Sequence, residues 1–180
     1  MNRIILAYCH QNAELAETVE QQLSRIGIPF EPISDRPGET PGSFSSRLAG
    51  AEDPVVLFIT DNLLKSRDCM EGTLAAIQLL QRRQRVLAVV ADGRISKDGG
   101  LTYEAVETHF DRMVYALQYM NYWQTAWLEL SSRHQHAEGE AREKLETELN
   151  ATRNIANEIG ELISLLREKR CPMVLCNQTF

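Results

Sequence analysis

The amino-acid sequence predicts an α/β fold built on a parallel β-sheet. Short, unbroken apolar runs, typical of strands covered on both faces, alternate with amphipathic helical segments, and turn residues separate each run from the next. The predicted strands lie at residues 3–8, 28–33, 55–60 and 86–90. Because a helical segment stands between successive strands, right-handed crossovers would place all four strands parallel.

The segments between these strands follow the same logic. Asn12 offers an N-cap for a first helix whose apolar residues recur at steps of three and four. Pro29 and Pro32 confine the second strand to a sheet edge, because proline cannot donate to a ladder. A short helix at 44–51 and a longer one at about 68–81 complete the crossovers.

Beyond Gly99-Gly100 the pattern changes to two long amphipathic helices. Apolar residues recur at three and four residue steps over 106–127 and again over 145–166. The polar link 131–136 between them predicts an antiparallel helical hairpin. The same spacing permits a coiled coil, although too few heptads are present to prefer one.

The predicted organisation is therefore an α/β domain at residues 1–100 and a helical hairpin at 101–170 that packs on this domain or projects from it. Residues 171–180 are a tail or the truncated start of a further element. Within them, Met173–Cys176 has the composition of a last short strand, so the sheet would hold four or five strands.

Composition narrows the class of protein. With 180 residues, 43% of them apolar and 24% charged, the chain can bury a core without disulfides or metals. A net charge of −6 disfavours nucleic acid and anionic membrane surfaces as partners. The amino terminus turns polar too early for a signal peptide or membrane span, so we expect a cytoplasmic protein with reduced cysteines.

No metal site is expected from residue spacing. The four cysteines form no CxxC pair and no paired metal-ligand spacing. His134 and His136 lie on the polar link without a neighbouring cysteine or acidic cluster, so zinc is not expected there. The alternative interpretation of the cysteines is that of small buried apolar side chains.

The segment from Ser34 to Cys69 is where we expect the functional site. A proline-glycine loop at 35–44 precedes a buried strand, and the polar turn 60–66 then opens a helix near Cys69. In an open α/β sheet such loops border a crevice at the carboxyl ends of the strands. A plain surface turn is the competing interpretation of the loop.

Over roughly the first half of the chain, these residues resemble a Toll/interleukin receptor (TIR) domain. The resemblance is carried by Ile4–Tyr8 at the first strand, by Asp35, Gly42 and Phe44 spaced as in the family's BB loop, by Val55–Thr60 at the third strand, and by Leu64–Cys69 before the next helix. It implies a flavodoxin-like parallel sheet. The second half is similar, more loosely, to the helical extension that follows TIR domains in certain bacterial proteins.

The resemblance implies two possible uses, which employ the same crevice and loop. Some TIR domains assemble with other TIR domains, whereas others are enzymes that cleave the nicotinamide-ribose bond of NAD. In the enzymes a glutamate on the helix after the third strand stabilises positive charge on the ribose. In the enzymes an aromatic residue and then a cysteine precede this glutamate. On this chain the aromatic position falls at Asp68, the cysteine at Cys69 and the glutamate at Gly72. Glu71 is the neighbouring acid, with a first-turn helix acid as its alternative interpretation.

The resemblance also assigns candidate residues to each use. Nucleotide contacts would come from Tyr8, Cys9, His10, Asp35 and Asp68, although His10 could equally be an ordinary loop histidine. In the BB loop, prolines stiffen the chain and glycines permit positive φ, so that the loop can project toward a partner. The interaction residues predicted there are Pro37, Gly38, Pro41, Gly42 and Phe44.

Three functions are therefore expected from the sequence. The first is a cytoplasmic, bacterial TIR-type signalling or defence module that makes homotypic contacts with other TIR domains or with itself and needs no cofactor. The second is an NAD glycohydrolase in which Glu71, or an acid from a neighbouring subunit, completes the site. The third is a nucleotide-binding sensor without turnover.

Overall fold

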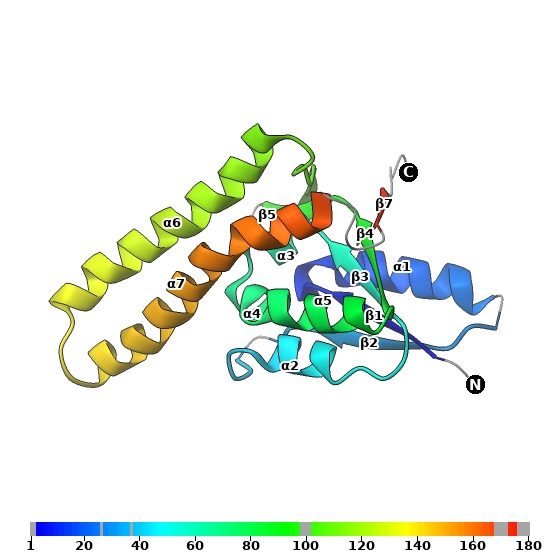
Figure 1. Ribbon diagram of the computed structural model, residues 1–180, viewed down its shortest axis with the longest axis horizontal. Helices are drawn as coiled ribbons and strands as arrows, with labels where there is room; N and C mark the ends of the chain where they lie inside the picture. The colour runs from blue at the N-terminus through cyan, green and yellow to red at the C-terminus, as the bar shows by residue number, and fades with distance from the viewer. Residues whose placement is uncertain (1–2, 26, 37, 98–101, 168–172, 176–180) are drawn as a thin grey trace.

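The centre of the fold is a parallel β-sheet in which the first strand is internal. The computed structural model (Figure 1) describes residues 3–25, 27–36, 38–97, 102–167 and 173–175. Its sheet has the order β2-β1-β3-β4-β7, and every pairing in it is parallel. The strands are β1 (Ile4–Tyr8), β2 (Phe30–Ser34), β3 (Val55–Ile59), β4 (Val86–Val90) and β7 (Met173–Leu175). This order is that of a flavodoxin-like sheet, and the α/β class and parallel sheet predicted from the sequence are confirmed.

The strand alternation divides the core between the two faces of the sheet. On one face, alternate residues of β1, β3 and β4, such as Ala7, Leu57 and Ala88, belong to the main core with helices α2, α5 and α7. On the other face, Leu6 and Phe58 pack with Leu15 and Ala16 of α1. The helices of the α/β part are α1 (Ala13–Ser24), α2 (Ser43–Ala49), α3 (Asp61–Lys65), α4 (Arg67–Met70) and α5 (Thr73–Arg82), with a 3-10 turn η1 (His10–Asn12) before α1.

The edge position predicted for the second strand is correct. β2 pairs with β1 alone among the described strands, and Pro32 lies opposite Leu6 in that register. A proline at an edge costs the sheet no ladder hydrogen bond on its open side.

A β-hairpin follows β4 where the sequence predicted the start of a long helix. Strands β5 (Gly93–Lys97) and β6 (Thr102–Val106) pair antiparallel. We had assigned Val106 and Phe110 to the helix because of their spacing, but Val106 ends β6 and Phe110 is buried in the main core ahead of the helix. The β-branched and aromatic residues of 102–106 suit a strand, and this local preference was overlooked.

Two long helices form the predicted antiparallel hairpin, with a shorter connection than expected. They are α6 (Met113–His136) and α7 (Gly139–Arg167), so the residues predicted as a polar link, 131–136, are the last turns of α6. Arg133 there is a cation at a helix carboxyl end, where the macrodipole favours positive charge. Gly139 has φ 57°, which suits the sharp reversal into α7.

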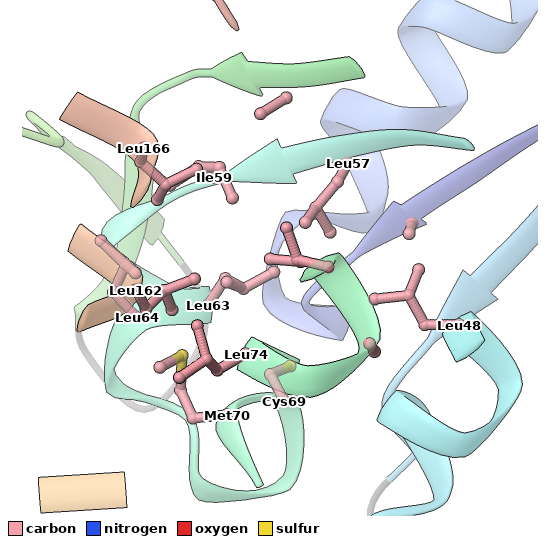
Figure 2. Close-up of a cluster of buried hydrophobic side chains, with 14 of the residues drawn as sticks. Leu48, Leu57, Ile59, Leu63, Leu64, Cys69, Met70, Leu74, Leu162 and Leu166 are labelled. Carbon is pink, nitrogen blue, oxygen red and sulfur yellow. The ribbon is translucent and has the colours of Figure 1, made fainter. Parts of the chain in front are cut away.

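The hairpin is anchored to the α/β part by its base. Tyr119 donates a hydrogen bond to Asp61 Oδ1 (3.0 Å), and Trp123 Nε1 donates to the Leu64 carbonyl (2.8 Å). Burial, with the nearby Asp61, raises the pKa of Tyr119 well above its usual range. Leu162 and Leu166 of α7 lie against Ile59 and Leu64 (Figure 2), whereas the far end of the hairpin projects away from the sheet (Figure 1).

None of the described helices combines the length and the apolar character that crossing a bilayer requires.

Candidate functional site

The carboxylate of Asp35, directly after β2, is the centre of the candidate site. Its side chain is only 3% exposed. Oδ1 accepts a hydrogen bond from the His10 backbone N–H (2.5 Å), and Oδ2 lies 2.7 Å from His10 Nδ1. Asp35 thus holds both the backbone and the imidazole of the residue that follows β1, while 43% of the His10 side chain remains exposed.

Two further groups approach the same carboxylate oxygen. Cys9 Sγ lies 3.9 Å from Asp35 Oδ2, and the Ser66 hydroxyl lies 3.5 Å from it. Ser66 also caps α4 by accepting a hydrogen bond from the Cys69 backbone N–H (3.3 Å). Hydrogen bonding with Cys9, together with burial, raises the pKa of the Cys69 thiol. Residues that follow β1 and the residue that caps α4 therefore meet at the buried carboxylate of Asp35, which follows β2.

Polar bridges span the neighbouring gap between β1 and β3, which is the switch point of the strand order. Thr60 donates to Asn12 Oδ1 (2.8 Å), and Asn62 Nδ2 donates to Gln11 Oε1 (2.7 Å). Asn12 occupies the N-cap position of α1, as predicted, but its side chain makes no cap hydrogen bond, because its buried amide oxygen accepts from Thr60 instead. In such a sheet, ligands usually bind in a crevice at the switch point. Here the hydrogen bonds of Thr60 with Asn12 and of Asn62 with Gln11 run across that position.

The helix predicted at 68–81 is broken at the position that matters most for an NAD hydrolase. α4 ends at Met70, Glu71 has extended backbone (ψ 115°), and Gly72 has φ 74° before α5 begins. A Cβ atom on Gly72 would lie 2.8 Å from Ser45 Oγ of α2. Both the backbone conformation and the space therefore favour glycine, and a longer side chain here would require Ser45 to move.

Glu71, the neighbouring acid, faces a different environment from the Asp35 cluster. Its Oε2 atom is buried and has no hydrogen-bond partner among the described residues. Burial raises the pKa of Glu71, and the charges that act on it are those of Arg67 and Asp68. Asp68 itself lies 3.9 Å from Arg67 Nε. Glu71, the predicted catalytic residue, and Asp68, a predicted nucleotide contact, therefore lie close to Arg67 at α4.

The 35–44 loop consists of two successive turns. Glu39 N–H donates to the Arg36 carbonyl (3.1 Å), and Ser43 N–H donates to the Thr40 carbonyl (3.1 Å). Gly38 (φ 85°) and Gly42 (φ 77°) occupy the third positions of these turns, where positive φ is needed. Pro41 is exposed, as a partner contact requires, whereas Pro37 lies outside the described residues.

Arg47 of α2 fixes the loop from behind. Its guanidinium donates to Glu39 Oε1 (2.7 Å) and to the Ser34 carbonyl (2.5 Å). The hydrogen bond from Arg47 also lowers the pKa of Glu39. Phe44, predicted to contact a partner, is instead 1% exposed in the main core, because it is on the inner face of α2. Phe44 therefore anchors the loop and has almost no exposed surface with which to contact a partner.

Tyr8 does not join the cluster either. It lines a cavity of about 600 Å³ below the loop, with Ser34, Arg36 and Arg47 among the other lining residues. Burial is the main cause that raises the pKa of Tyr8. This hollow runs along the open edge of β2, on the same rim of the molecule as the 35–44 loop.

The structure thus brings together three of the five predicted nucleotide contacts, Cys9, His10 and Asp35, and it places the loop beside the start of the Cys69 segment, as predicted. Sequence reasoning missed Ser66 as a member of the cluster. A serine one residue before a short helical turn with an aspartate in it is an N-cap signal, and this signal could have identified Ser66. Asn62 carries no such signal, because its bridge to Gln11 depends on tertiary packing.

Comparison with models of known protein families finds no match, and a search of curated proteins finds no relative.

Gly72→Ala should destabilise the protein more than Gly27→Ala. Both glycines have φ near 75°, where alanine costs about 1–2 kcal/mol, but space around Gly27 is open and Gly72 faces Ser45. We expect an additional loss of about 1–3 kcal/mol at Gly72 in urea denaturation. Part of this loss should be recovered in a Ser45→Ala background. Equal costs at the two glycines would contradict the close approach.

Glu71→Gln should stabilise the protein at neutral pH. Because burial raises the pKa of Glu71 in the folded state, the protonated form favours folding, and this stability is lost as the pH rises through the folded pKa. At pH 7 the variant should therefore have a higher melting temperature than the wild type, and the gain should vanish below pH 4.5, the ordinary pKa. The exposed Glu52→Gln is the control. A lower melting temperature at pH 7 would reveal a stabilising partner for the carboxylate.

Proposed function

We propose that the chain is a TIR-type signalling module that assembles with further copies of itself, or with other TIR domains, through the 35–44 loop. The observation that carries this proposal is the construction of the loop. Its outer residues Arg36, Thr40 and Pro41 are exposed, while Arg47 and the buried Phe44 hold it from behind. A loop that is rigid before it meets a partner loses little conformational entropy on binding.

The surroundings of Gly72 support assembly over chemistry. An acid at position 72, where the resemblance calls for one, would have to displace the Ser45 side chain, and Glu71 is bordered by Arg67 and Asp68 on the α4 side. Cleavage of a glycosidic bond needs a carboxylate at the reacting carbon, because positive charge develops on the ribose. NAD hydrolysis by this chain alone would thus need an acid from a neighbouring subunit.

The shape of the molecule suits a role in assembly. A specific interface buries about 800 Å² on each partner. The loop borders the cavity along β2. Together, the loop and the cavity offer a partner a hollowed surface that carries both positive and negative side chains. The helical hairpin leaves the domain on the side of α3 and α4 and would act as a stiff connector (Figure 1).

One observation favours a second candidate, a ligand-binding sensor without turnover. Asp35 orients the His10 imidazole through Nδ1, and this leaves Nε2 on the part of the side chain that is exposed. Because Asp35 Oδ2 accepts from Nδ1, Nε2 of the neutral ring is an acceptor that can receive a hydrogen bond from a ribose hydroxyl of a nucleotide. The polar groups of Gln11 and Asn62 stand beside it on the same rim.

Arg36→Glu should weaken self-association, since the arginine is exposed at the tip of the proposed contact. We expect the association constant, measured by analytical ultracentrifugation over a concentration series, to fall about tenfold or more. Arg85→Glu is the matched control, because Arg85 is an exposed arginine before β4, at the opposite end of the strands. The proposal is wrong if both variants associate like the wild type, or if the wild type stays monomeric at high concentration.

For the second candidate, NAD or ADP-ribose should raise the melting temperature of the wild type without release of nicotinamide, since a ligand that binds only the folded form stabilises it. The shift should be lost in His10→Gln. Chromatography of the same mixtures detects nicotinamide. Release of nicotinamide under assembling conditions would favour the hydrolase instead, and no shift with either compound would remove the sensor.

A further inference from the structure

We propose that Cys9, His10 and Asp35 form a binding site for a divalent transition metal of the zinc type. Sγ of Cys9, a ring nitrogen of His10 and a carboxylate oxygen of Asp35 all lie within 4.8 Å of one another. The three residues come from the ends of two neighbouring strands, β1 and β2, which the parallel sheet brings to the same edge. Their separation in sequence conceals the cluster from any analysis of spacing.

The donor set selects the class of metal. Thiolate sulfur, imidazole nitrogen and carboxylate oxygen are the three ligand types that zinc accepts in proteins. Magnesium and calcium take oxygen ligands and have little affinity for thiolate, so this set disfavours them. The three ligand types together therefore favour zinc over magnesium and calcium, although one residue supplies each type.

The geometry needs only small adjustments to hold such an ion. Ordinary zinc bond lengths with tetrahedral angles place ligand atoms roughly 3.4 Å apart for nitrogen and oxygen and roughly 3.6 Å apart for sulfur and oxygen. The corresponding distances here are 2.7 Å from His10 Nδ1 to Asp35 Oδ2 and 3.9 Å from Cys9 Sγ to Asp35 Oδ2. Rotation of the exposed imidazole accommodates the larger of the two changes.

Charge balance also favours an ion at this place. Asp35 is almost fully buried, and a buried charge is costly unless it is paired. A dication that binds the carboxylate and the Cys9 sulfur, whose thiol proton is released to solvent on binding, forms a neutral unit with them. The hydrogen bond from the His10 backbone N–H to Asp35 Oδ1 already fixes the orientation of the carboxylate, as outer hydrogen bonds do in metal sites.

With three protein ligands, a tetrahedral ion would take its fourth ligand from solvent water, which reaches the exposed His10 ring. The Cys69 thiol is hydrogen-bonded with Cys9, but it does not belong to the group whose ligand atoms all lie within 4.8 Å of one another. Cys69 therefore serves as a matched control: it is a buried cysteine in the same neighbourhood that the proposal leaves out of the coordination shell.

The test is a titration of the full chain, after treatment with a chelator, with zinc chloride alone. Calorimetry should show one ion per chain, and zinc at about 100 times its dissociation constant should raise the melting temperature by about 5–10 °C. Cobalt in place of zinc should give the visible absorption of a tetrahedral ion and a thiolate-to-cobalt band in the near ultraviolet.

Four variants decide the assignment of ligands. His10→Gln and Cys9→Ser should each lower zinc affinity by more than the roughly 10–100-fold that loss of an outer-shell partner costs, and Cys9→Ser should also abolish the thiolate band. Cys69→Ser and His109→Gln should bind zinc as the wild type does, with the thiolate band retained. His10 is exposed, so its variant should remain folded, as circular dichroism can verify.

The proposal is overturned if the wild type binds no zinc. It is equally overturned if His10→Gln and Cys9→Ser, both folded, keep wild-type affinity, because the ion would then be held elsewhere on the chain. Loss of the thiolate band in Cys69→Ser, with the band retained in Cys9→Ser, would assign the sulfur ligand to the wrong cysteine and would also refute it.

Discussion

The arrangement of residues at the carboxyl ends of β1 and β2 depends on the buried carboxylate of Asp35. Through one side chain it holds the backbone and ring of His10 after β1, and it receives the Cys9 thiol and the Ser66 hydroxyl that begins α4. Two segments far apart in sequence, Cys9–His10 and the start of α4, thereby share one acceptor. Such a group is costly to bury without partners, so the arrangement of the partners is as constrained as the acid itself.

A second constraint is the close approach of Gly72 to Ser45. The approach packs α2 against the α4–α5 break, and this packing brings the 35–44 loop beside α4. A side chain at position 72 would have to displace Ser45, so glycine is favoured there. The contact between α2 and the α4–α5 break thus bears both on the position of the loop and on the residue at position 72.

The sheet could be predicted from the sequence because its strands are unbroken apolar runs whose signal is local. The run Val55–Ile59 and the prolines at the β2 edge needed no tertiary information. The β5–β6 hairpin was missed because Val106 and Phe110 also fit a helical period. The break at Gly72 was missed because only Ser45, distant in sequence, explains it. Of the candidate site, Cys9, His10 and Asp35 were predicted through a resemblance, but their mutual contacts depend on register between β1 and β2.

The attachment of the helical hairpin has a mechanical consequence. Tyr119 and Trp123 are bound to Asp61 and Leu64, the residues that lead from β3 directly to Ser66 and the Asp35 carboxylate. A force on the distant tip of α6 and α7 would therefore reach that short segment as well as the core that α7 shares with α5 and β3. The segment 61–66 is thus where a load on the hairpin would meet the groups around the Asp35 carboxylate.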